Sequence, residues 1–246
     1  MSMTTAPESE RTPKPEHFRA YSGKLWRIVE AQHRISTNRL VADAGDQALL
    51  EQLVEEVKPN LPAAAKHLHY LLATPFRYGH KSSSRFRRAG EKPGIFYAAE
   101  TVATAIAETA YWQLRFYSRS PGFQPPSTTV EHSAISVTVE MARVLDLCSH
   151  PYIAAASLWT APEDYSACQL FAAQARLIET QALRYASVRD PQHRANVAIF
   201  DASVFSDPVP RNAQTWHFRY EQGQLTAFGA FPSKERFSFR PSDFGL

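Results

Sequence analysis

Cysteine is scarce in this chain, which has only Cys148 and Cys168 among its 246 residues. A disulfide framework, or a zinc site built from thiolates, needs more cysteines or a clear ligand spacing. We therefore expect both side chains to be reduced, buried thiols.

Long hydrophobic runs are also missing from the sequence. No apolar segment reaches the roughly 18 residues that would cross a bilayer. The amino terminus has no basic, apolar, small-residue signal for secretion. We therefore expect a cytoplasmic protein.

Several well-known catalytic motifs are absent. The chain has no Gly-x-Gly-x-x-Gly fingerprint, P-loop, His-Glu-x-x-His or Gly-x-Ser-x-Gly segment. Hydride transfer and phosphoryl transfer are therefore poor explanations of its function. The histidines are scattered, and the neighbouring His67 and His69 have no obvious third ligand, so we predict no metal site.

The net charge of +3 is too small to imply nucleic-acid binding by itself. The cations are nevertheless unevenly chosen, with 20 arginines and 7 lysines. Arginine presents a planar fork that suits phosphate or carboxylate, which favours an anionic ligand or partner. Surface pairing with the 24 acidic residues would explain the arginines equally well.

The chain is long enough for one sizeable hydrophobic core, and we predict a single domain over residues 18–246. Residues 1–17 carry Pro7, Pro13 and Pro15 among charged and small polar residues, without an apolar run to bury. This composition predicts a flexible lead.

Helical patterns cluster early in the chain. We predict an amphipathic helix over 46–57, a weaker one over 63–72 that ends before Thr74-Pro75, and further helices from Thr101 to about Arg115 and over 166–179.

Strands are predicted mainly in the second half. They lie at 94–97, 135–139, 183–188 and 197–200, with a final hairpin that turns at Gln222-Gly223. Regular strand-helix alternation is missing, so we predict an α+β fold with a compact mixed core and an added amino-terminal helical region.

The basic segment 81–88 allows three interpretations. Clustered arginines beside Phe86 could grip the phosphates of a nucleic acid. The segment could equally be a solvated loop. Its position before the predicted strand and the helix that follows also suits a rim that binds the phosphates of a small ligand.

Seven short motifs follow one another along the chain. They are Trp26-Arg27-Ile28-Val29-Glu30-Ala31-Gln32-His33, Pro75-Phe76-Arg77-Tyr78, Ser84-Arg85-Phe86-Arg87, Ile95-Phe96-Tyr97-Ala98-Ala99-Glu100, Ala105-Ile106-Ala107-Glu108, Arg184-Tyr185-Ala186-Ser187-Val188-Arg189 and Asn196-Val197-Ala198-Ile199-Phe200-Asp201. In this order they resemble the successive motifs of the RES-domain family. Each motif alone is weak, but the ordered set is fairly specific.

The resemblance carries expectations about fold and function. RES proteins resemble the ADP-ribosyltransferase fold, with a cleft for NAD+, and typically act as toxins neutralised by a small helical, Xre-like antitoxin encoded beside them. It implies that NAD+ is the substrate. The arginine, glutamate and serine that name the family match Arg27, Glu108 and Ser187, and its tyrosine matches Tyr97.

The chemistry of NAD+ supports a catalytic role for Glu108. Nicotinamide is already a cationic, weakly held leaving group, and its loss leaves positive charge on the ribose. A carboxylate beneath the sugar would stabilise that charge and orient a nucleophile. The acceptor could be water or phosphate, which would deplete NAD+, or a protein side chain. Without the resemblance, Glu108 would be read as an exposed residue at the edge of a helix stripe.

We assign the other residues by their chemistry within that resemblance. Arg27 and Tyr97 join Glu108 in the catalytic group, and Arg27, Arg85, Tyr97 and Ser187 are expected to bind NAD+. Arg27 suits the pyrophosphate and Arg85 a second anionic or ribose contact, whereas Tyr97 could stack on nicotinamide and Ser187 could bind its amide or the ribose. Each also has a plain structural explanation, as a surface ion pair, a core ring or a turn hydroxyl. Lesser candidates are Tyr78, Arg189 and Asn196.

Overall fold

The structure is a computed structural model that describes residues 10–30, 58–120, 122–126 and 128–246. The predicted helix over 46–57 and the first nine residues of the predicted lead lie outside the described residues. Within the described residues, no helix is long and apolar enough to cross a membrane.

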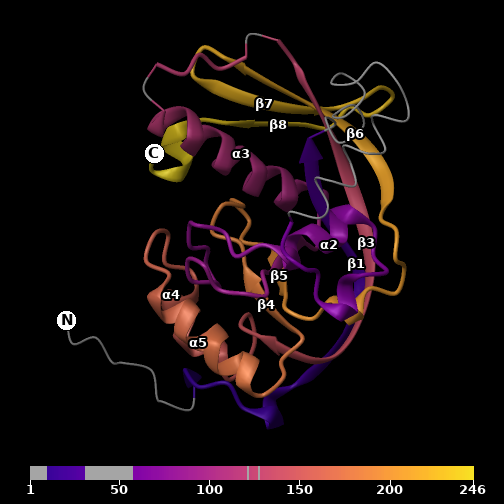
Figure 1. Ribbon diagram of the computed structural model, residues 1–246. Coiled ribbons are helices and arrows are strands. Elements are labelled where there is room, and N and C mark those ends of the chain that lie inside the picture. Colours follow the sequence, from indigo (N-terminus) through magenta and orange to yellow (C-terminus); the bar gives the residue numbers. More distant parts are fainter. Residues whose placement is uncertain (1–9, 31–57, 121, 127) are drawn as a thin grey trace, which may run out of the picture.

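Eight strands form one sheet (Figure 1). They are β1 (Arg19–Glu30), β2 (Phe96–Ala99), β3 (Val130–Asp146), β4 (Ala182–Ala186), β5 (Ala195–Ile199), β6 (Arg211–Glu221), β7 (Gln224–Gly229) and β8 (Arg236–Phe239). Their order is β1-β2-β5-β4-β3-β6-β7-β8, and β1 also pairs with β3. The first five strands in this order therefore close a hydrogen-bonded ring, from which β6, β7 and β8 extend.

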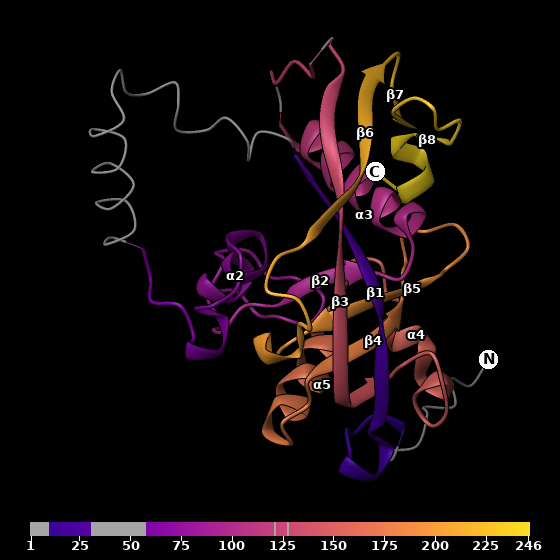
Figure 2. The same cartoon turned by 90° about the vertical axis from the view of Figure 1, so that its right-hand side faces the viewer.

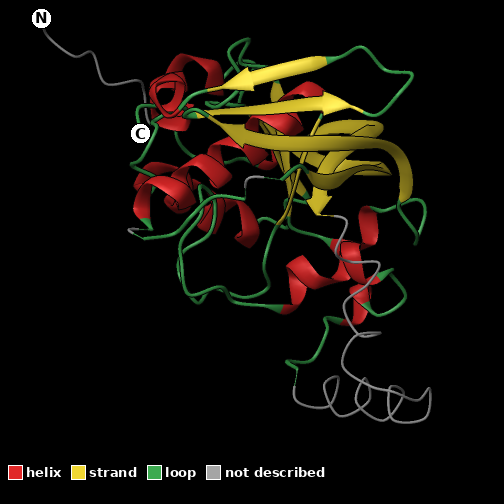
Figure 3. Cartoon of the chain, turned by 90° about the horizontal axis from the view of Figure 1, so that it is seen from above, coloured by secondary structure: helices red, strands yellow, loops and turns green. Residues whose placement is uncertain are grey.

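The helices lie on both faces of the sheet. They are α2 (Tyr70–Arg77), α3 (Val102–Arg119), α4 (Ala156–Trp159) and α5 (Ser166–Leu177), with 3-10 turns at Pro15–His17, Ala63–Ala65, Tyr152–Ala155, Ala202–Val204 and Pro241–Phe244. In Figure 1, α3 lies beneath β7 and β8, and α4 and α5 lie beside β4. Figure 2 shows α2 on the opposite side from α4, and Figure 3 shows the helices from above. The predicted α+β class is confirmed.

Three hydrophobic clusters hold the helices against the sheet. Strand β5 separates two of them, because successive side chains of a strand point to opposite faces. Val197 and Ile199 pack in one cluster with α2, whereas Ala198 packs in another with α5. The third cluster joins α3 to the extension formed by β6, β7 and β8. Helix α3 is thus fixed at the point where the ring of strands meets the extension.

Helix α3 forms as its sequence predicts, although it ends at Arg119 rather than near Arg115. The side chain of Thr101 accepts a hydrogen bond from the Thr104 backbone N–H at 3.1 Å and so caps the helix. Ile106 and Leu114 are buried on one stripe, and burial of each stabilises the fold by roughly 1.5 to 3 kcal/mol. This packing fixes the rotation of the helix about its axis.

The prediction for residues 63–72 is wrong in its boundaries. The structure has a 3-10 turn at Ala63–Ala65 and then helix α2, which continues through Pro75. Proline lacks the N–H that would bond to the carbonyl four residues earlier. Burial of Leu72 and Phe76 on the inner face offsets that loss, since Phe76 packs against Phe205 with ring centres 6.3 Å apart.

Strand β1 has no counterpart among the predicted elements. It pairs with β3 along its whole length, yet Leu25 is its only fully buried residue. A strand whose two faces are similarly half-exposed lacks the apolar-polar alternation from which a strand is predicted in the sequence.

The predicted carboxy-terminal hairpin is confirmed. Glu221 of β6 pairs with Gln224 of β7. The two residues between them, Gln222 and Gly223, have φ angles of 51° and 77°. Positive φ at both positions is the geometry of the tight turns that join antiparallel strands.

Both cysteines are free thiols. Cys168 is buried as predicted, whereas Cys148 is only partly buried. Burial raises the pKa of both thiols, so they remain protonated at neutral pH.

Candidate functional site

Glu108 lies in the second turn of α3, and its carboxylate points toward β4 and β5. The Ser187 hydroxyl donates to Oε1 of Glu108 at 2.6 Å, and the Asn196 amide nitrogen donates to the same oxygen at 2.6 Å. Within the described part of the chain, the second oxygen, Oε2, forms no hydrogen bond. One oxygen is therefore held by two donors while the other can face a ligand.

Ser187 is fixed in the turn that follows β4. Its oxygen accepts hydrogen bonds from the backbone N–H groups of Arg189 at 3.2 Å and Asp190 at 3.0 Å. A hydroxyl has one proton and two lone pairs, so the proton is directed to Glu108. Ser187 is fully buried. The Ser187 hydroxyl therefore both stabilises the turn and holds the Glu108 carboxylate.

A buried carboxylate ties this turn to the start of α3. Thr104 donates to Oδ2 of Asp190 at 2.6 Å, and Arg194 donates to its two oxygens at 2.6 and 2.9 Å. Burial acts to raise the pKa of Asp190, but hydrogen bonds from Arg194 and Thr104 outweigh it, so the pKa is lowered. Asp190 was not among the predicted site residues, yet it fixes Ser187 relative to Glu108.

Asn196 lies at the centre of the sheet, paired with Ala99 of β2 on one side and Tyr185 of β4 on the other. It is buried, and the described structure shows only one side-chain hydrogen bond for it, the bond to Glu108. The pKa of Tyr185 is raised, first by burial and then by the charges of Glu108 and Tyr97. Tyr185, which the sequence reasoning missed, therefore lies near both predicted site residues.

Tyr97 is held by the basic segment in front of it. Its hydroxyl lies 2.9 Å from the Ser84 hydroxyl and accepts from the Phe86 backbone N–H at 3.2 Å. Burial raises its pKa to about 12, so the phenol is neutral at physiological pH. Because the hydroxyl is already engaged, the face of the ring is the part that remains for a ligand.

Arg27 contacts β2 and makes no hydrogen bond to Glu108 in the described structure. Its Nη1 donates to the Tyr97 carbonyl oxygen at 3.3 Å, and its guanidinium lies 5.0 Å from the centre of the Phe96 ring. Burial lowers its pKa to about 10, which still leaves it charged at neutral pH. Its other N–H groups form no hydrogen bond with described residues, so they are available to an anion.

Arg85 and Arg87 turn inward. Nη1 of Arg85 donates to the carbonyl oxygens of Trp159 and Ala161 at 2.8 and 2.9 Å. The Arg87 guanidinium donates to the Ser82 carbonyl at 2.8 Å, and only 9% and 4% of the two residues are exposed. Segment 81–88 therefore presents fewer cations than its sequence suggests, which argues against a nucleic-acid-binding surface.

Two of the lesser candidates have structural contacts. The Arg189 guanidinium lies 3.6 Å from the centre of the Tyr111 ring, and its Nη2 donates to the Pro162 carbonyl at 2.6 Å. The Tyr78 ring lies beside His80. Neither side chain bonds to Glu108 in the described structure.

His69 has a local structural role, because its Nδ1 accepts a hydrogen bond from the Leu71 backbone N–H at the start of α2. Among the described residues, no cluster of three or more histidine, cysteine, aspartate or glutamate side chains could hold a metal ion.

Comparison with known proteins finds one matching family model. A family model described as the RES domain matches residues 61–221, a span that includes Arg85, Tyr97, Glu108 and Ser187 but not Arg27. No curated protein sequence matches the chain. Among solved structures, the crystal structure of the M. tuberculosis MbcT-MbcA toxin-antitoxin complex is similar with a TM-score of 0.43. The sequences are 14% identical, and the similarity covers 93% of this chain and 90% of that chain.

Proposed function

Because the chain belongs to the RES-domain family, we propose that it is an enzyme that cleaves the nicotinamide-ribose bond of NAD+, as the toxin of a toxin-antitoxin pair. The observation that carries the proposal is the arrangement at Glu108. Ser187 and Asn196 both donate to Oε1, whereas Oε2 is unengaged within the described residues. A carboxylate held in one orientation suits the stabilisation of charge that develops on a substrate.

Glu108 would act on the ribose of NAD+. As the bond between C1′ and the nicotinamide nitrogen breaks, its electron pair leaves with nicotinamide, which becomes neutral. Positive charge then develops on the ribose, next to Oε2 of Glu108. An oxygen of water or phosphate bonds to C1′, and with water a proton is released. A preorganised group of this kind contributes roughly a hundredfold to a thousandfold in rate.

The remaining predicted residues would bind and orient NAD+. Arg27 supports this role because, among the described residues, its guanidinium forms one hydrogen bond, to the Tyr97 carbonyl oxygen, which leaves N–H groups for a pyrophosphate contact. Tyr97 would offer its ring face to nicotinamide, since its hydroxyl is bonded to Ser84 and Phe86. Arg85 would contribute mainly its charge, because Nη1 is occupied by two carbonyl oxygens.

The cognate partner would be a small helical, Xre-like antitoxin. An antitoxin that presents a carboxylate or a chain terminus to Arg27 would compete with the pyrophosphate of NAD+. NAD+ consumption by the purified pair, compared with the free chain, tests this part of the proposal. Full activity within a stable complex would contradict it.

The test of the reaction is NAD+ consumption by the purified full chain and its Glu108→Gln variant. Glutamine keeps an oxygen that can accept from Ser187 and Asn196 but removes the negative charge. We expect turnover to fall by at least about a hundredfold. Glu140→Gln, at an exposed position of β3, is the matched control and should keep the wild-type rate.

The products identify the acceptor. Chromatography with and without phosphate separates nicotinamide, ADP-ribose and phosphorylated ADP-ribose. Wild-type rates in Glu108→Gln would refute the role of this carboxylate. Intact NAD+ in every sample, with labelled ADP-ribose on protein, would replace the proposal with protein ADP-ribosylation.

A further inference from the structure

One face of helix α3 contacts the turn that follows β4, residues 187–190, at three points. The contacting residues of α3 are spaced four and three positions apart, so they share one face of the helix. They are Thr104, Glu108 and Tyr111. Their partners in the turn are, in the same order, Asp190, Ser187 and Arg189. The first two contacts are hydrogen bonds of 2.6 Å, and the third is a guanidinium placed over an aromatic ring.

Arg189 is a buried cation that forms no ion pair with a described residue. Only 6% of it is exposed, and a charge removed from water needs a compensating group. The Tyr111 ring supplies one, with its centre 3.6 Å from the guanidinium, and the Pro162 carbonyl accepts from Nη2 at 2.6 Å. A cation over a ring is bound more strongly when water is excluded. The position of Arg189 therefore depends on Tyr111.

The Tyr111 ring is itself held in place. Only 2% of Tyr111 is exposed, and the Phe244 ring packs edge-on against it with ring centres 5.5 Å apart. The Tyr111 hydroxyl forms no hydrogen bond with described residues, so the ring face is the part that acts on Arg189. Tyr111 follows Glu108 by three residues, which is nearly one helical turn. The ring and the carboxylate are therefore fixed to the same rigid segment.

The backbone of Arg189 connects this stack to Glu108. Its N–H donates to the Ser187 oxygen at 3.2 Å, and the Ser187 hydroxyl donates to Oε1 of Glu108 at 2.6 Å. A hydroxyl has a single proton, so the N–H groups that occupy its lone pairs decide where that proton points. A displacement of Arg189 would therefore change the bond that holds the carboxylate.

We propose that Tyr111 is a positioning residue for the Glu108 carboxylate and acts through Arg189. The stack holds the turn so that the Ser187 proton points to Oε1, which leaves Oε2 toward the substrate. Neither Tyr111 nor Arg189 forms a hydrogen bond to Glu108 in the described structure, so the effect passes through the turn. This role rests on the proposed cleavage of NAD+.

Steady-state NAD+ consumption by the full chain and two variants measures this role. Tyr111→Leu fills the site without a ring face, whereas Tyr111→Phe keeps the face and loses only the hydroxyl. We expect kcat of Tyr111→Leu to fall about fivefold to thirtyfold, the range that a shielded cation-ring contact contributes. Its KM should stay within about twofold of the wild type, because the orientation of Glu108 acts on the transition state. Tyr111→Phe should keep the wild-type kcat.

Two kinetic results would overturn the proposal. One is a wild-type kcat in folded Tyr111→Leu. The other is a raised KM with an unchanged kcat, because Arg189 would then bind the substrate instead of orienting the turn.

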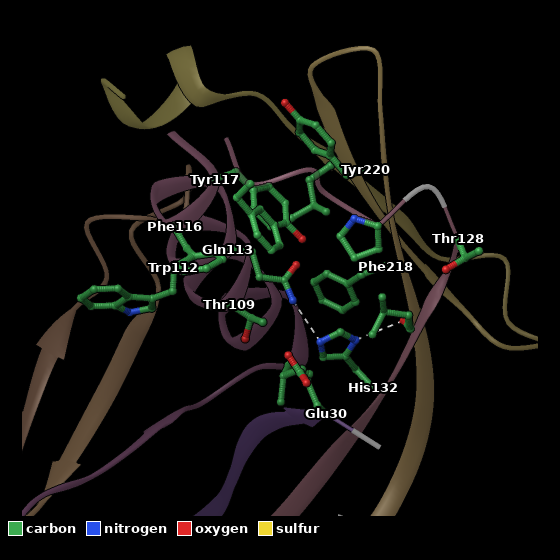
Figure 4. A pocket seen from close by; sticks show the side chains of 15 residues that line it. Glu30, Thr109, Trp112, Gln113, Phe116, Tyr117, Thr128, His132, Phe218 and Tyr220 are labelled. Atoms are coloured by element: carbon green, nitrogen blue, oxygen red, sulfur yellow. Dashed lines mark hydrogen bonds between the residues drawn. The ribbon is translucent and has the colours of Figure 1, made fainter. Parts of the chain in front are cut away.

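Tyr117→Leu is the matched control, since it makes the same change on the same helix. Figure 4 shows Tyr117 in the wall of a separate cavity, together with Phe116 and Tyr220, and no residue of the turn lines that cavity. This variant should keep the wild-type kcat. Equal losses of kcat in the two leucine variants would overturn the proposal, because both would follow from a general loosening of α3.

Arg189→Leu removes the stack from its other side and leaves the backbone N–H in place. It also removes the buried charge, so it should fold even where Tyr111→Leu leaves that charge uncompensated. Thermal unfolding verifies the fold of each variant. We expect kcat to fall over the same range, and the double variant to be no slower than the slower single variant. Additive losses would overturn the proposal, because the two residues would then act separately.

Amide hydrogen exchange separates this role from the proposed reaction. The N–H groups of Arg189 and Asp190 both donate to the Ser187 oxygen, so in Tyr111→Leu they should exchange at least about tenfold faster. Amide protons of β4 should keep their rates, as should all of these groups in Tyr111→Phe. Unchanged exchange at both positions in folded Tyr111→Leu would overturn the proposal. A wild-type chain that consumes no NAD+ would instead refute the proposed function.

Discussion

The hydrogen bond from Asn196 to Glu108 gives a sharp test of how the carboxylate is held. Asn196→Ala removes one of the two donors to Oε1, a bond of 2.6 Å. No other side-chain hydrogen bond of Asn196 is present in the described structure, so the substitution disturbs little else. A hydrogen bond to a charged group contributes about 1.5 to 3 kcal/mol. At about 1.4 kcal/mol for each factor of ten, kcat/KM for NAD+ should fall about 10-fold to 150-fold.

The double variant Ser187→Ala, Asn196→Ala shows whether the two donors act together. Both bond to the same oxygen, so their effects on kcat/KM should not add. The assay is steady-state NAD+ consumption, with thermal unfolding as the control for folding. A rate for folded Asn196→Ala within threefold of the wild type would refute the reasoning, because the donor would then not orient the carboxylate.

Three further predictions concern residues around this site. The pKa of Asp190 is lowered below its ordinary value of 3.8 in the folded chain, so the stability it contributes is present above that value and is lost as the pH falls. Asp190→Asn should therefore flatten the acid limb of a plot of unfolding free energy against pH, and an unchanged slope below about pH 4 would contradict this. Gly94 lies against the backbone oxygens of Pro75 and Tyr78. The added methyl group of Gly94→Ala should therefore lower the free energy of unfolding, measured with denaturant, by about 1 to 3 kcal/mol. An unfolding midpoint equal to that of the wild type would contradict this packing. Tyr97→Phe should lower the free energy of unfolding by about 1 to 3 kcal/mol, because the Phe86 N–H loses its acceptor. The variant should keep NAD+ turnover, since the ring remains. A folded but inactive variant would show that the hydroxyl takes part in the reaction.

Local sequence signals predicted the elements that local interactions define. Helix α3 has a capping threonine and a continuous apolar stripe, and the final hairpin has a two-residue turn that tolerates positive φ. Strand β1 escaped recognition because its stability comes from pairing with β3, more than a hundred residues away in the sequence. Helix α2 continued through Pro75 because tertiary burial outweighed a local preference.

In the candidate site, too, some residues could be predicted from the sequence and others depend on contacts between distant residues. The resemblance to the RES family pointed to Glu108 and Ser187, and the structure places them in direct contact. The role of Asp190 could not be inferred, since its bond to Thr104 joins residues 86 positions apart. Arg85 was predicted to contact NAD+, and the sequence did not reveal that its Nη1 donates to the backbone carbonyl oxygens of Trp159 and Ala161. A basic sequence segment does not reveal which way its side chains turn.

The length of β3 has a consequence for how the protein unfolds. Along its 17 residues this strand pairs with β1, with β6 near its start and with β4 at its end. The extension beside α3 and the sheet around Asn196 therefore share one backbone, and neither can open fully without breaking hydrogen bonds of that strand. Amide protons at the middle of β3 should then exchange only through global unfolding, at the slowest rate among the described residues.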